Sequence, residues 1–188
     1  MNTLDDSQFT PDPSKVSVIK TGVKYGIMLG LAGVISQLVM LLLGMNDSGA
    51  DPTTSALLNL LSLAISIAII VFAVRYHRDR ELGGFISFGR GMKLCFWLGL
   101  VSGIITAIWT WIYQNLIAPE SLDAIKTEIE KIKAQVDDGE VPEMTLTIME
   151  WTYAAVTNPL SIMVGSLLSI LFIGLFVSLF TKRNPVVY

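Results

Sequence analysis

The stretch SALLNLLSLAISIAIIVFAV, residues 55–74, contains no charged side chain. A helix rises 1.5 Å per residue, so about 20 apolar residues cross the ~30 Å hydrocarbon core of a bilayer. A buried helix of a soluble protein is the alternative for any single run of this kind. Three more uncharged runs of sufficient length lie at 25–45, 94–118 and 160–181. The rest of the 188 residues could not bury all four, so the sequence predicts four transmembrane helices.

The composition agrees with a membrane protein. Hydrophobic residues make up 52% of the chain and charged residues 15%, whereas soluble domains carry about 25% charged residues. Cys95 and His77 are the single cysteine and histidine. An internal disulfide is therefore excluded, and so is a His-rich metal site within one chain. We expect no metal ion, no cofactor and no nucleic-acid partner.

The distribution of lysine and arginine predicts the orientation, because cytoplasmic loops of membrane proteins are enriched in these residues. The flank before the first run, the segment between the second and third runs, and the end of the chain carry ten of them. The short segment 46–54 has none, and the long segment between the third and fourth runs has three. Both termini are thus predicted to be cytoplasmic, in a bacterial inner membrane. The ten are Lys15, Lys20, Lys24, Arg75, Arg78, Arg80, Arg90, Lys93, Lys182 and Arg183.

The predicted fold class is an all-α, four-helix transmembrane bundle with an extracytoplasmic helical hairpin between the third and fourth spans. The spans are expected at about 22–45, 55–75, 93–118 and 159–181. An inner loop is expected at 76–92 and an outer helical loop at 119–158. Residues 15–188 would form a single membrane domain. The acidic, proline-containing segment 1–14 is predicted to be a disordered cytoplasmic tail rather than a signal peptide.

Two apolar stripes predict the hairpin. The first follows helical spacing and consists of Leu122, Ile125, Ile129, Ile132 and Val136. The second, weaker stripe consists of Met144, Ile148, Trp151 and Ala155. We expect the first stripe to meet the neighbouring arm, the membrane surface or another protein. Asn158-Pro159 predicts a kink or break between the second arm and the last span.

Small residues recur at four-residue spacing within the spans. Such positions let helix backbones approach closely in lipid. Packing within one chain is the favoured interpretation, and a homo-oligomer or partner interface is the alternative. The candidates are Gly22, Gly26, Gly30, Gly99, Gly103 and Gly165.

The basic inner loop suggests a second candidate site. A Lys or Arg beside anionic head groups contributes on the order of 1 kcal/mol of attraction. A topology anchor is the favoured role, and specific contact with a lipid head group is the alternative. The candidates for that contact are Arg75, Arg78, Arg90 and Lys93. His77, which lies among these arginines, is expected to be a cytosolic surface residue.

Three stretches of the chain resemble the DUF4199 family of uncharacterised membrane proteins, found mostly in Bacteroidota. These are KYGIMLGL at 24–31, YHRDRELGGFISFGRGMKLCFWLGLVSGIITAIWTWIY at 76–113, and GSLLSILFIGLFVSLFTKR at 165–183. The block ELGGFISFG, followed by a glycine-rich span, is the most specific part. The resemblance implies an inner-membrane protein with this number of helices. It implies no activity and no catalytic residue.

The sequence is consistent with two functions. The first is a non-enzymatic scaffold or accessory subunit of an envelope complex, with membrane lipids, a second copy or another envelope protein as partners. The alternative is a lipid-handling or small-solute transport protein that uses the basic loop. An enzyme is disfavoured, because the sequence has no nucleophile elbow, phosphate-binding loop or zinc-protease motif. An ion-coupled transporter is disfavoured because no ionised residue lies deep in a span.

Overall fold

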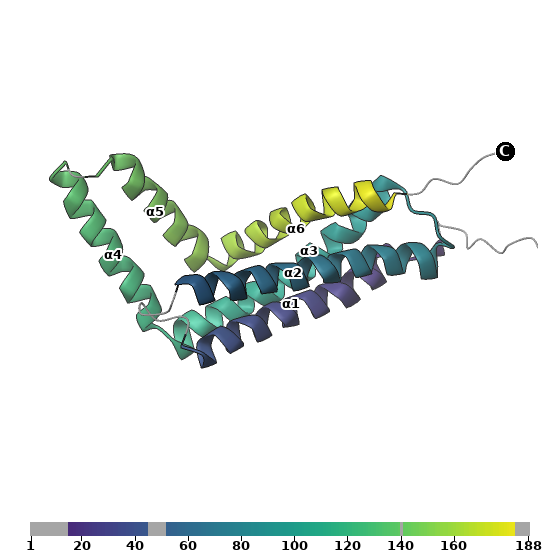
Figure 1. Cartoon of the computed structure of the whole chain (residues 1–188), viewed down its shortest axis with the longest axis horizontal. Helices are drawn as coiled ribbons and strands as arrows, with labels where there is room; N and C mark the ends of the chain where they lie inside the picture. The colour runs from purple at the N-terminus through teal and green to yellow at the C-terminus, as the bar shows by residue number, and fades with distance from the viewer. Residues whose placement is uncertain (1–14, 45–51, 140, 183–188) are drawn as a thin grey trace, which may run out of the picture.

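The computed structural model describes residues 15–44, 52–139 and 141–182. Within these ranges the chain forms six α-helices (Figure 1), and two of them continue into a π-helical turn. The helices are α1 (Val18–Leu42), α2 (Pro52–Tyr76), α3 (Phe88–Ile112), α4 (Glu120–Asp137), α5 (Glu143–Thr157) and α6 (Pro159–Thr181). The turn η2 (His77–Glu81) follows α2, and η3 (Tyr113–Ile117) follows α3.

Four helices are long and apolar enough to cross a membrane, as predicted: Val18–Leu42, Thr53–Glu81, Phe88–Ile117 and Pro159–Thr181. A helical pair, α4 and α5, separates the last two spans. The predicted all-α fold, with four candidate membrane spans and a helical pair between the third and the fourth, is therefore confirmed. The expected tail at 1–14 lies outside the described residues. The four helices begin before their uncharged runs do, most clearly α1 at Val18 and α3 at Phe88, because an uncharged run marks the part suited to hydrocarbon and not the whole helix.

The core lies toward one end of the four-helix bundle. We call this end the basic end, because four basic residues lie near it: Lys20, Lys24, Arg75 and Arg90. We call the opposite end of the bundle the hairpin end. Every described residue of α2 that is fully buried is near the basic end, and the first half of α2 is mostly exposed. The central core residues are Tyr25, Leu29, Ile70, Ala73, Val74, Leu94, Cys95, Leu98, Ile170 and Val177.

Glycines set the distance between α1 and α3. A Cβ atom built on Gly22 would lie 2.6 Å from the Cβ of Trp97, and one on Gly26 would lie 2.8 Å from the Cβ of Val101. A Cβ on Gly30 would lie 2.9 Å from the Cβ of Ile105. The spacing of four residues places all three glycines on one face of α1. That face lies directly against α3 without room for a methyl group.

Glycines also join α3 to α6. A Cβ on Gly103 would lie 3.0 Å from the carbonyl oxygen of Met163, and one on Gly99 would lie 3.0 Å from Leu167 Cδ1. Gly174, on α6, faces Cys95 in the same way at 2.6 Å from Sγ. Gly165 differs from the other five candidates, because nothing lies within 4 Å of its would-be Cβ.

The hairpin of α4 and α5 leans away from the bundle at the hairpin end (Figure 1). The residues of the first stripe, from Leu122 to Val136, are half-buried, and α4 packs against α5. A shallow pocket bounded by Ile129 and Tyr153 marks this contact. The first stripe therefore meets the neighbouring arm, which is one of the three partners considered above.

The junction between α5 and α6 is a break, as Asn158-Pro159 predicts. Asn158 is extended, and its side-chain oxygen accepts a hydrogen bond from the Leu160 amide at 2.9 Å, which caps α6. Gln114, in η3, donates to the carbonyl oxygen of Val156 at 2.8 Å. The last turn of α5 is thus tied to the end of α3.

Candidate functional site

His77 is fully buried at the basic end, so the expectation of a surface residue was wrong. Its two ring nitrogens each have a partner. Nδ1 contacts Oε2 of Glu81, and Nε2 accepts a hydrogen bond from Nε of Arg90 at 3.1 Å. A guanidinium can only donate, so Nε2 carries no proton. The geometry therefore describes a neutral imidazole whose Nδ1–H donates to the carboxylate.

The network extends from His77 to α1. Oγ1 of Thr21, which is buried, donates to the same Glu81 oxygen at 2.7 Å. Arg90 also donates through Nη2 to the carbonyl oxygen of Val16. One connected set of hydrogen bonds thus joins the start of α1, the turn η2 and the first turn of α3. Buried polar groups need such partners, because each unpaired group costs about 1–3 kcal/mol.

The turn η2 brings these side chains together. A π-helical turn is wider than an α-helical turn and often occurs at functional positions. Gly83 and Gly84 end it with φ values of +67° and +98°, a region that other residues rarely adopt. The Gly84 amide then donates to the carbonyl oxygen of Arg78 at 2.8 Å. The GG of ELGGFISFG therefore has a conformational role in the reversal from α2 to α3.

The contacts of His77 suit a structural role, in which the ring holds the turn η2 and helix α3 together through hydrogen bonds. They do not suit proton transfer to or from a substrate. Both ring nitrogens are engaged by protein groups, and the imidazole has no exposed surface. The sequence offered only a weak signal for it, namely a His and a Glu four residues apart. The charged residues around that pair suggested exposure.

The four basic candidates fall into two groups. Arg78 donates to both carboxylate oxygens of Asp79 and, at 3.3 Å, to the carbonyl oxygen of Thr181. Arg90 belongs to the His77 network. Arg75 and Lys93 are exposed. Two of the four candidates thus bind other parts of the same chain, and the structure does not gather all four in one place.

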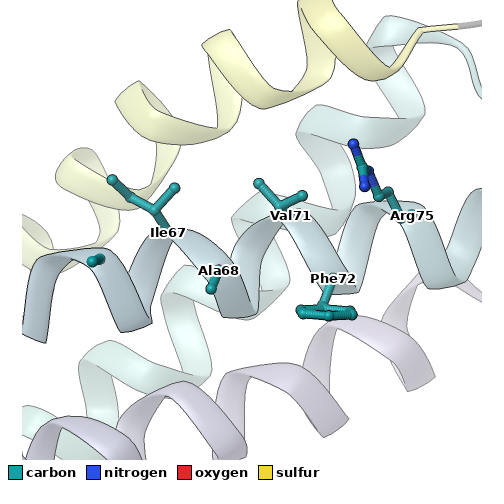
Figure 2. A pocket seen from close by; sticks show the side chains of 6 residues that line it. Ile67, Ala68, Val71, Phe72 and Arg75 are labelled. Atoms are coloured by element: carbon teal, nitrogen blue, oxygen red, sulfur yellow. The ribbon is translucent and has the colours of Figure 1, made fainter. Parts of the chain in front are cut away.

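Arg75 lies at one end of an apolar groove of about 410 Å³ on α2. Figure 2 shows Ile67, Val71 and Arg75 projecting from the helix toward α6, and Phe72 projecting away from it. Ala64 and Ala68 complete the lining. The groove therefore runs between two rows of side chains with four-residue spacing, and its small residues leave room along the helix.

The second stripe forms an exposed face of α5. Met144 is 72% exposed, Ile148 57% and Trp151 76%, and Ala155 is also exposed. We call these four residues the α5 apolar face. The half-buried residues Leu146, Met149 and Tyr153 lie on the opposite side of the helix, toward α4. The α5 apolar face has no partner among the described residues.

The part of the chain that the structure describes contains no group of three His, Cys, Asp or Glu side chains placed to hold a metal ion. Cys95 is a free thiol in the core. On the hairpin, a hydrogen bond from Lys126 to Asp123 at 3.1 Å raises the pKa of the lysine. This pair, like that of Lys131 with Glu128, joins neighbouring turns of α4.

Comparison with protein-family models gives a match over most of the chain. Residues 24–182 match the model of a family described as "Protein of unknown function (DUF4199)". No curated protein and no solved structure matches.

Proposed function

We propose, from the premise that this chain belongs to the DUF4199 family over residues 24–182, that it is a non-enzymatic scaffold or accessory subunit of a complex in the bacterial inner membrane. In this proposal the α5 apolar face binds another envelope protein. The exposure of Trp151 and Met144, on a hairpin that leans away from the bundle, is the observation that carries it.

The chemistry of the hairpin defines the partner. Exposed tryptophan and other large apolar residues are the usual anchors of protein interfaces. Residues 119–158 contain nine acidic residues and three lysines, a net charge of −6. Anionic lipid head groups would repel this segment, whereas a protein with an apolar pocket and a basic rim complements it. We therefore assign the α5 apolar face to such a protein rather than to the membrane surface.

Photocrosslinking in native membranes tests this assignment. A photoreactive amino acid at Ile148 or Trp151 is expected to crosslink to one and the same protein, and to crosslink at an apolar surface bordered by Lys and Arg. The same group at Lys133, exposed on α4, is the matched control and should give no such product. Trp151→Ala should weaken the association by about 30-fold, as for an anchor worth about 2 kcal/mol. Adducts with lipid alone would contradict the proposal.

The proposed orientation places both termini in the cytoplasm and the hairpin outside. Cys95 is buried, so labelling of introduced cysteines should have a low background. In intact cells we expect a membrane-impermeant maleimide, once past the outer membrane, to label Glu128→Cys. Arg80→Cys should react only after the inner membrane is permeabilised. Both positions are exposed, and the reverse pattern would overturn the orientation.

A further inference from the structure

We propose that the groove on α2 is a binding site for one anionic phospholipid, with its phosphate on Arg75 and an acyl chain along Ala64 and Ala68. This site goes beyond the scaffold role, since it lies in the membrane domain rather than on the hairpin. Of the four basic candidates of the inner loop, Arg75 is the one that lines the groove.

The length of the groove matches the thickness of the hydrocarbon layer of one leaflet. It extends from residue 64 to residue 75, which is ~16 Å along a helix at 1.5 Å per residue. Half of the hydrocarbon core of a bilayer is about 15 Å thick. An acyl chain that follows the groove from Arg75 therefore ends near the middle of the membrane, as the acyl chains of lipids in the adjacent leaflet do.

The lining of the groove fits an acyl chain. Ile67, Val71 and Phe72 supply apolar walls, and the two alanines leave space between them. Close approach of a chain to the helix at these alanines increases dispersion contact. Nothing in the lining except Arg75 carries a charge, so the polar part of a ligand has a single place to bind.

Arg75 is available to an anion, in contrast to Arg78 and Arg90. Among the residues that the structure describes, it makes no hydrogen bond or ion pair. The nearest acid along the helix, Asp79, uses both carboxylate oxygens to accept from Arg78. Arg78 in turn holds the end of α6 through Thr181. A guanidinium can donate two parallel hydrogen bonds to a phosphate. The phosphate of one lipid head group could accept both of them from Arg75.

Retention of lipid by the full-length protein tests the site. The protein is reconstituted in nanodiscs of equal parts phosphatidylglycerol and phosphatidylcholine, then released and analysed by native mass spectrometry. We expect the wild type to retain phosphatidylglycerol, and Arg75→Gln to retain about five-fold less, the effect of ~1 kcal/mol from one cation. Arg80→Gln removes an exposed charge two turns or less away and should retain as much as the wild type.

Two outcomes would overturn the proposal. Equal losses in Arg75→Gln and Arg80→Gln would mean diffuse electrostatic attraction rather than a site. Equal retention of phosphatidylcholine and phosphatidylglycerol by the wild type would mean that the groove does not select an anion.

A second measurement locates the acyl chain of the lipid and does not depend on how much lipid the protein retains. A phosphatidylglycerol with a photoactivatable group on its acyl chain should form adducts within residues 64–72. Ala68→Trp fills the groove and should reduce them several-fold, whereas Leu60→Trp, at an exposed position of α2 outside the groove, should not. Adducts spread evenly over the exposed residues of the four spans would overturn the site.

Discussion

Replacement of Gly26 by leucine is expected to lower the melting temperature of the detergent-solubilised protein by roughly 2–12 °C. A Cβ at this position would lie 2.9 Å from the carbonyl oxygen of Leu98, a backbone atom that cannot rotate away. The α1–α3 contact must therefore open. Overpacking of this kind costs about 1–3 kcal/mol, and 1 kcal/mol corresponds to about 2–4 °C in a chain of this size.

Gly33→Leu is the matched control for this prediction. Gly33 lies on the same helix, and nothing is within 4 Å of its would-be Cβ. The substitution also has the same effect on helix propensity. We expect its melting temperature to equal or exceed that of the wild type. Equal losses in the two variants would show that the close α1–α3 contact is not what stabilises the bundle.

Replacement of His77 by alanine is expected to reduce the free energy of unfolding by about 3 kcal/mol. The change leaves a cavity in a fully buried site and removes the group that both Glu81 and Arg90 contact. Unpaired buried polar groups cost about 1–3 kcal/mol each, more when charged. Thermal unfolding in detergent should show a drop of roughly 6–12 °C.

His77→Phe separates the two causes, because phenylalanine fills the space but has no ring nitrogens. A loss close to that of the alanine variant is expected if hydrogen bonding dominates, as we infer. A phenylalanine variant as stable as the wild type would refute that inference. Arg80→Ala, an exposed change in the same turn, should leave the melting temperature unaltered.

The membrane spans could be predicted because uncharged length is a property of the sequence alone. Residues 55–74 need hydrocarbon whatever they pack against. The hairpin was predicted for a similar reason, since the stripe from Leu122 to Val136 has helical spacing. Its partner, α5, was one of three alternatives, because periodicity identifies an apolar face but not the surface that covers it.

The site could be predicted only in part. The four-residue spacing of glycine indicated close packing, but it gave no sign that Gly165 faces open space while Gly103 faces Met163. Rotation of a helix about its own axis decides this, and tertiary contacts set that rotation. His77 was placed wrongly because three arginines surround it in sequence, whereas the widened turn η2 points it into the bundle. The role of Arg90 depends on the same turn, because Arg90 donates a hydrogen bond to His77.

The uneven burial of α2 has a mechanical consequence. Ile70, Ala73 and Val74 hold the helix at one extremity, and the opposite half contacts its neighbours sparsely. A helix of 25 residues is ~37 Å long, so a tilt of about 5° about the fixed extremity displaces the free one by ~3 Å. We therefore expect thermal displacement of α2 to be largest beside the hairpin and smallest at His77.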